Sequence, residues 1–383
     1  MDGGETNHLK NRNVLVLSST VSLILLSLYS WYYLFPLYLK ELGASDREVG
    51  ISYALFTLGF TLAQCIGGYL TDRFGRKWVI ILPTYFFPIF YLLLAVSKVW
   101  YLPVIFYLFI AVGSAIQIPA FTSIIAESTK RKGKAFGLFE FYIALGIAFG
   151  PLIGSVLIDR IGIRTLIIST AVTCLIGAIL RHIFLVETQQ VKQPKKGAVK
   201  TSLNRNFGLF LLSGAFLFLV FSISIHGPFM TLFQKESLKF SESRISLLFA
   251  IGGILSALSS LLGGSMTDKL GGKKILGMSV CLHPFLLFLW SSLSGFTPFF
   301  VISFAFSQFC YIAYQVVITD LTEEETRGRL IGIFGTTTGL ISSLGPIIGM
   351  QLKIHYGHKA PFYLAFGFGI ISFLILQCVK EKK

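Results

Sequence analysis

The chain contains twelve long runs of apolar residues separated by short polar segments, and this pattern constrains its fold more than any other feature. A helix that crosses the hydrocarbon core of a membrane needs about 20 such residues. Backbone polar groups in lipid must be bonded within their own segment, so continuous apolar runs predict helices. We therefore expect an all-α integral membrane protein with twelve transmembrane helices. The runs cover residues 14–39, 49–70, 79–96, 101–125, 135–158, 165–184, 207–233, 245–266, 275–293, 298–319, 330–352 and 361–379.

The composition also indicates a chain that lies mostly in lipid. Hydrophobic residues make up 54% of the 383 positions and charged residues 13%, whereas soluble domains have about 25% charged residues. This excludes an ordinary soluble enzyme, and intrinsic disorder needs the opposite composition. The net charge of +15 fits either a basic groove that binds nucleic acid or basic loops of a membrane protein. The apolar runs favour the second interpretation.

The positions of Lys and Arg predict the orientation in the membrane. If the N-terminus is cytoplasmic, most of these residues fall in segments on the cytoplasmic side, and basic loops favour that side. We expect a multi-pass protein of the cell membrane with both termini in the cytoplasm. The basic segments on that side are 10–12, 73–77, 130–134, 192–205, 269–274, 327–329 and 380–383.

The chain repeats itself at about half its length. GYLTDRFGRK at 68–77 matches GSMTDKLGGK at 264–273, with an offset of 196 residues. A Gly-Pro-x-x-Gly pattern at 150–154 recurs at 345–349, with an offset of 195. Two motifs in nearly constant register predict two six-helix halves in parallel orientation, a recurring plan among transporters that bind substrate between the halves. We expect the halves at 1–186 and 207–383, joined by a basic cytoplasmic linker at 187–206.

These motifs resemble those of the major facilitator superfamily. The segment 68–77 is similar to motif A of that family, in the loop between spans two and three, and 146–154 is similar to its motif C in span five. The resemblance covers nearly the whole chain and is greatest to twelve-span drug/proton antiporters. It implies a secondary transporter that works by alternating access, in which Asp72 faces span eleven and latches the cytoplasmic side.

Motif A predicts a turn between two helices and a set of gating residues. Gly75 and Gly271 permit tight backbone geometry just past a helix end, and Asp72 and Asp268 are placed to meet a helix N-terminus. The alternative is a solvated basic loop that only fixes topology. The gating candidates are Gly68, Asp72, Arg73, Gly75, Arg76, Lys77, Gly264, Asp268, Gly271 and Lys273. We expect Arg76 and Lys77 to pair with Glu127, and Lys273 and Lys274 to pair with Asp320 or with a residue of Glu323 to Glu325.

Motif C predicts a close approach of helices. Its glycines recur every fourth residue on one face, and small residues let helices pack closely. We expect this contact to be the gate between the halves, with a proline adding a kink. The residues are Gly146, Gly150, Pro151, Gly154, Gly345, Pro346 and Gly349.

Two titratable residues inside spans are candidates for coupling transport to an ion. Glu140 is the one acidic residue well inside a span, and it either carries a proton or meets a cationic substrate. The alternative is a gate residue bonded to Lys132, Lys134 or an arginine of the other half. His226 in span seven titrates near neutrality if unperturbed, whereas His283 is expected to bond locally.

The resemblance places spans one, four, seven and ten around a central cavity, and each carries a stripe of polar residues. These stripes either contact substrate or form hydrogen bonds between helices. No cation is available on them, so we expect a neutral, amphipathic or cationic substrate and not an anion. The candidates are Tyr29, Tyr33, Tyr107, Ser114, Gln117, Ser222, Gln308, Tyr311 and Gln315.

The sequence thus predicts an exporter of amphipathic or cationic small molecules, with protons as the candidate coupling ion. An importer or facilitator of a neutral solute such as a sugar fits the polar stripes equally well. A non-transporting membrane scaffold or receptor is the alternative from another class. No catalytic cluster, metal-ligand spacing or phosphate loop is found, so we expect no enzymatic activity, metal or cofactor. We expect a monomer that binds no nucleic acid.

Overall fold

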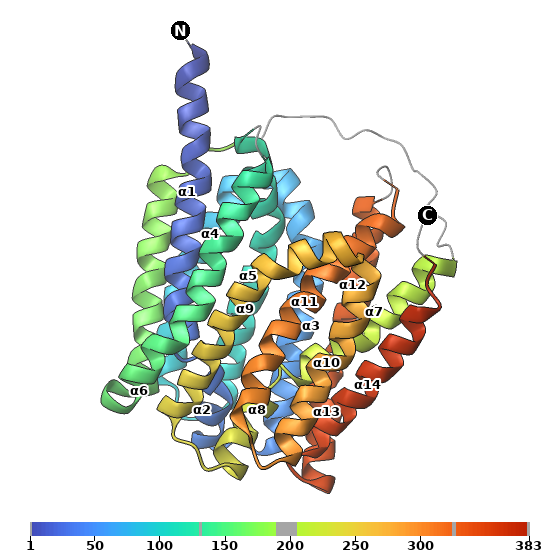
Figure 1. Cartoon of the computed structure of the whole chain (residues 1–383). Coiled ribbons are helices and arrows are strands. Elements are labelled where there is room, and N and C mark those ends of the chain that lie inside the picture. The colour runs from blue at the N-terminus through green and yellow to red at the C-terminus, as the bar shows by residue number, and fades with distance from the viewer. Residues whose placement is uncertain (1, 130–131, 189–204, 324–326, 381–383) are drawn as a thin grey trace. The chain divides into compact units, whose positions relative to one another are not determined.

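The computed structural model describes residues 2–129, 132–188, 205–323 and 327–380, and within them the chain is helical almost throughout, with no strand. Figure 1 shows the helices from blue at the N-terminus to red at the C-terminus. The first half contains α1 (Asp2–Tyr29), η1 (Tyr32–Leu34), α2 (Phe35–Glu41), α3 (Asp46–Phe74), α4 (Arg76–Val96), α5 (Tyr101–Ser128) and α6 (Lys132–Phe184). The second contains α7 (Arg205–Ile223), α8 (Phe229–Leu232), η2 (Phe233–Ser237), α9 (Glu242–Leu270), α10 (Gly272–Ser292), α11 (Thr297–Leu321), α12 (Arg327–Ser342), α13 (Gly345–Tyr356) and α14 (Ala360–Gln377).

The number of membrane spans agrees with the prediction. Eleven helical segments among the described residues are long and apolar enough to cross a membrane. One of them, Lys134–Phe184, has 51 residues, whereas a single span needs about 20. Gly162 breaks this segment with a backbone φ of 72°, so it provides two spans. The all-α class and the twelve-span arrangement are confirmed.

The internal repeat is visible in the helices themselves. α3 and α9 both have 29 residues and start 196 positions apart, and α4 and α10 both have 21 residues at the same offset. Gly75 and Gly271 precede α4 and α10 with φ of 87° and 89°. Only glycine adopts this geometry without strain, so the tight turn predicted for motif A is confirmed in both halves.

The described chain forms two compact units that follow the halves except in two segments. The first unit comprises 1–44, 59–194 and 242–250, and the second comprises 45–58, 195–241 and 251–383. The start of α3 therefore packs in the second unit, and the start of α9 in the first. Most of the predicted linker lies outside the described residues, so the half boundaries at 186 and 207 stay a prediction.

An asparagine closes each half by joining its first helix to the end of its last. Asn13 Nδ2 donates to the Val186 carbonyl at 3.0 Å, and Val186 N donates to Asn13 Oδ1 at 2.9 Å. Asn206 makes the same pair of bonds with Lys380, at 2.7 and 2.9 Å. This two-way amide contact holds the ends of each six-helix half together, and it is the same in both halves because the halves repeat.

In the second unit, a glycine and a proline interrupt one span. α7 ends at Ile223 and helix resumes at Phe229, after Gly227 and Pro228. Proline cannot donate to the preceding turn, so it favours such a break.

The core of this unit contains tightly packed aromatic rings, among them Phe210 stacked on Phe334 at 5.2 Å.

Candidate transport site

The arginine of motif A in the first half forms the ion pair that the sequence predicts. Arg76 Nη2 lies 3.0 Å from Glu127 Oε1, and its Nη1 donates to the Thr71 carbonyl at 3.2 Å. Asp72 is one helical turn before Arg76, at 3.8 Å, with its side chain 82% exposed. The Arg76–Glu127 pair therefore joins the start of α4, which carries the end of motif A, to the end of α5.

A second carboxylate, which the sequence reasoning missed, covers the start of α4. Glu187 accepts hydrogen bonds from the backbone N–H groups of Arg76 at 3.2 Å and Lys77 at 2.9 Å. These N–H groups have no partner within the helix, and a negative charge there is stabilised by the helix dipole. Lys77 was also predicted to pair with Glu127. Instead, its backbone N–H group bonds to Glu187.

In the second half, the expected partner of the motif A lysine is wrong. Lys273 Nζ donates to the carbonyls of Gln377 at 3.2 Å and Val379 at 2.6 Å. A cation at the carbonyl end of α14 is favoured in the same way as an anion at the N-terminus of α4. Two of the acidic residues proposed as partners, Glu324 and Glu325, lie outside the described residues.

The glycines of motif C pack α6 directly on α1 of the same half. A Cβ added to Gly146 would lie 2.8 Å from Leu25 Cβ, and one added to Gly150 would lie 2.7 Å from the Leu26 carbonyl oxygen. The Cβ of an alanine at Gly154 would overlap the Ser30 carbonyl oxygen. The close approach was predicted correctly, and its partner here is α1. The role of these glycines as a gate between the halves stays a prediction.

The second copy of motif C behaves in the same way within the second unit. A Cβ at Gly345 would overlap Ser222 Oγ at the end of α7, and one at Gly349 would lie 2.6 Å from the Phe229 ring. Ser222 is buried and donates to the Leu219 carbonyl at 2.9 Å. The glycines of α13 therefore fit against the broken span formed by α7 and α8.

Glu140 is an isolated carboxyl group on α6. Its side chain is exposed, and within the described part of the chain it has no hydrogen bond or ion pair. Lys134, one of the partners considered for it, makes no such contact with it, and the side chain of Lys132 is outside the description. A carboxylate within a membrane span is costly without a partner.

Two histidines of the second half, His226 and His283, differ in the way the sequence suggests. His283 is buried between Ser224 Oγ at 3.0 Å from Nε2 and the Ser303 carbonyl at 2.9 Å from Nδ1, so its local bonding is confirmed. His226 lies in the break between α7 and α8, with its side chain exposed and its ring 6.4 Å from that of Phe221. Its role in coupling stays a prediction.

Three of the tyrosines proposed to line the cavity belong to one aromatic cluster in the first unit. Tyr29 and Tyr33 have ring centroids 5.5 Å apart, and Tyr33 stacks on Phe249 at 3.9 Å. Tyr32 joins them to Tyr107, with which it stacks at 6.1 Å. Tyr29, Tyr32, Tyr33 and Tyr107 are all partly exposed. Aromatic faces attract organic cations and pack well against flat apolar molecules.

The remaining polar candidates occupy different surroundings. Gln117 is buried, whereas Gln315 is exposed and donates to the Tyr314 hydroxyl at 2.7 Å. Gln308 accepts a bond from Ser256 at 3.3 Å. Tyr311 is 49% exposed and Ser114 is partly exposed. Their contact with substrate stays a prediction.

A buried arginine near the end of α6 was missed because the sequence places it beside a basic loop. Arg181 is 2% exposed and donates to Thr20 Oγ1 at 2.9 Å, Thr84 Oγ1 at 2.8 Å and Gln117 Oε1 at 3.2 Å. Its guanidinium lies 5.4 Å from the Phe121 ring. A buried cation is therefore present inside the first unit, bonded to the polar candidate Gln117. The charge of the substrate stays a prediction.

Comparison with known proteins decides the family. A model of the Major Facilitator Superfamily matches residues 17–225 and again residues 212–382. The chain belongs to the major facilitator superfamily. It is 26% identical to the multidrug resistance protein 2 of Bacillus subtilis, covering 91% of this chain and 90% of that protein. It is 23% identical to the quinolone resistance protein NorA of Staphylococcus aureus, covering 97% and 98% of the two chains.

Solved structures of major facilitator transporters share the fold. The nucleoside transporter NupG superposes with a TM-score of 0.79 at 15% identity, covering 96% of this chain and all of that one. A bacterial homologue of the lysosomal transporter Spinster superposes with a TM-score of 0.73 at 16% identity, covering 96% of each chain. The protein is a multi-pass membrane transporter of this superfamily and not an enzyme.

Proposed function

We propose that this major facilitator transporter exports amphipathic or cationic small molecules by alternating access, in exchange for protons carried by Glu140. The observation that carries the proposal is the isolated carboxyl group of Glu140 on α6. Such a group costs free energy in a span whenever it is charged. A carboxyl that binds and releases a proton during the cycle accounts for its presence.

The substrate class is supported by the aromatic cluster and by the names of the relatives. Tyr29, Tyr32, Tyr33 and Tyr107 present partly exposed rings from α1, η1 and α5. Two relatives that match nearly the whole chain are named for resistance to multiple drugs and to quinolones. Aromatic rings bind flat or cationic organic molecules by stacking and by cation–π attraction.

The test is flux in proteoliposomes with an imposed pH gradient, using a lipophilic dye cation as the substrate. Wild type is compared with Glu140→Gln and with Asp159→Asn, which removes another exposed carboxylate from the same helix. We expect gradient-driven flux in wild type and Asp159→Asn and its loss in folded Glu140→Gln. Flux that is independent of the gradient and unchanged in Glu140→Gln would overturn the proposal and favour a facilitator of neutral solutes.

A further inference from the structure

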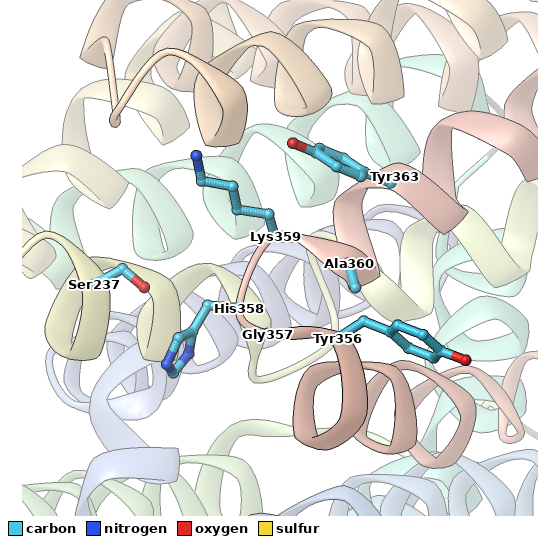
Figure 2. Close-up of a pocket in the computed structure, with 7 residues that line it drawn as sticks. All are labelled: Ser237, Tyr356, Gly357, His358, Lys359, Ala360 and Tyr363. Carbon is cyan, nitrogen blue, oxygen red and sulfur yellow. The ribbon is translucent and has the colours of Figure 1, made fainter.

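A pocket in the second unit opens where α13 ends and α14 begins. Its volume is about 500 Å³, within the range of sites that bind small molecules. Figure 2 shows its lining side chains, with Lys359 and Tyr363 above and His358 and Tyr356 below in this view. Ser237, at the end of η2, also lines the pocket. The pocket therefore gathers an ammonium group, an imidazole and three hydroxyl groups.

A short turn that contains a glycine places these side chains. Gly357 ends α13 with a backbone φ of 87°, and its N–H group donates to the Lys353 carbonyl at 2.9 Å. Ala360 starts α14, and its N–H group donates to the Gly357 carbonyl at 3.1 Å. Glycine adopts this φ without strain, so the chain reverses within three residues. Tyr356 and Lys359 are thereby held at the two ends of the same turn.

The ammonium and phenol groups of the pocket have protons to donate. Ser292 Oγ donates to the Tyr363 hydroxyl at 3.1 Å, so the proton of that hydroxyl remains available to a ligand. Within the described part of the chain, Lys359 Nζ donates one long hydrogen bond, 3.5 Å to the Ser292 carbonyl. Tyr356 is 78% exposed. Donors of this kind in one pocket suit a group whose oxygens accept hydrogen bonds, such as a phosphate.

The charges around the pocket also favour an anion. None of the described residues that line it carries a carboxylate. Glu236 precedes Ser237 in the chain, but it lies 2.6 Å from the buried ammonium of Lys353, so a cation of the protein already faces it. Lys239, two residues after Ser237, is exposed and adds a positive charge. A negatively charged ligand is therefore favoured here over a neutral or cationic one.

An exposed apolar stripe runs along α14 from the pocket. Tyr363, Ile370 and Leu374 share one face of this helix, at i, i+7 and i+11, and they are 43%, 39% and 58% exposed. Gly367 lies on the same face, and a Cβ added there would meet nothing within 4 Å. The stripe therefore has a notch between Tyr363 and Ile370. An acyl chain gains contact along such a surface, whereas a free phosphate ion does not.

We propose that this pocket binds the phosphate headgroup of an anionic phospholipid, with one acyl chain along the exposed stripe of α14. Lys359 and the hydroxyl groups of Tyr356 and Tyr363 donate to the phosphate oxygens. α14 has 18 residues, a length of about 27 Å, which is close to the thickness of the hydrocarbon core. The pocket at its first residue therefore lies at the level of the headgroups, where tyrosine and lysine side chains are favoured.

The test is native mass spectrometry of the full-length protein in detergent micelles, which counts bound lipids. Phosphatidylglycerol is compared with phosphatidylcholine, which has the same acyl chains and no net charge. We expect one phosphatidylglycerol to bind about tenfold more tightly, the effect of one charge-assisted hydrogen bond. Lys359→Gln removes this preference, Lys359→Arg retains it and Tyr363→Phe weakens it. The control Lys98→Gln, at an exposed lysine between α4 and α5, leaves it unchanged.

Inorganic phosphate and glycerol phosphate are added as competitors without acyl chains, and we expect neither to displace phosphatidylglycerol at equal concentration. Displacement by either one would indicate a site for free phosphate and would overturn the lipid proposal. Equal binding of the two lipids, or a preference that survives in Lys359→Gln, would overturn it too. A dimer free of lipid would show that a second copy of the chain covers the stripe, with the same consequence.

The variants leave the fold intact, because Lys359 and Tyr363 are both exposed, and the melting temperature of each preparation checks this. Lipid binding is measured without transport. Loss of the lipid preference therefore contradicts this inference alone, and absence of gradient-driven flux contradicts the proposed function alone.

Discussion

Arg181 on α6 donates a hydrogen bond of 2.8 Å to the hydroxyl of Thr84 on α4, inside the first unit. Its two other bonds also go to neutral oxygens, those of Thr20 and Gln117. A buried guanidinium with neutral partners gains less than one with a carboxylate, while its desolvation cost is the same.

This arrangement predicts an unusual order of stability for Arg181 variants. Thr20 and Thr84 donate their own hydroxyl protons to the carbonyls of Val16 and Ile80, so loss of the arginine leaves no orphaned donor on them. We expect Arg181→Met to melt at or above the wild-type temperature. Arg181→Lys keeps a buried charge with fewer bonds and should lose about 1–3 kcal/mol. Thermal unfolding in detergent measures both, and a less stable Met variant would show that the guanidinium is net stabilising.

A second prediction concerns the ion pair of motif A. Arg76 and Glu127 lie 3.0 Å apart, with side chains 13% and 34% exposed, so the pair is only partly screened. We expect a coupling energy of about 1 kcal/mol between them, because charge-assisted bonds at partly buried sites exceed surface pairs. A double-mutant cycle with Arg76→Gln and Glu127→Gln, followed by thermal unfolding, measures it. Strict additivity of the two changes would contradict the prediction.

The helices, their number and their repeat were predictable because they depend on local hydrophobicity and on motif spacing. Gly75 and Gly271 were also predictable, since a glycine after a long apolar run indicates a backbone that other residues do not adopt. The Arg76–Glu127 pair was predictable although the residues are 51 positions apart, because the sequence places these opposite charges at the ends of spans on the same side of the membrane.

The buried cations were not predictable in the same way. Arg181 and Lys353 lie near helix ends, and position alone places them in loops. Their side chains turn inward because partners from remote segments, Gln117 for one and Asp46 with Glu236 for the other, supply oxygens there. The partner of motif C was missed for a similar reason, since small residues indicate a close contact without indicating which helix makes it.

The packing of α6 on α1 gives a third prediction with an internal control. Alanine at Gly154 would place its Cβ on the Ser30 carbonyl oxygen, whereas alanine at Gly137 of the same helix meets nothing within 4 Å. We expect Gly154→Ala to lose about 1–3 kcal/mol through forced separation of the helices. Gly137→Ala should be neutral or slightly stabilising, because alanine favours helix. Thermal unfolding compares the two, and equal melting temperatures would contradict the close contact.

The repeated asparagine contact gives a fourth prediction, in which equivalent residues differ in strength. Asn13 is fully buried and donates a further bond to Ser128 Oγ at 3.2 Å, whereas the contacts of Asn206 with Lys380 are exposed. Removing a partner from buried backbone groups costs about 1–3 kcal/mol, and water replaces it at an exposed site. Asn13→Ala should therefore lower the melting temperature clearly more than Asn206→Ala. Equal losses, or the reverse order, would show that burial does not set the strength of this contact.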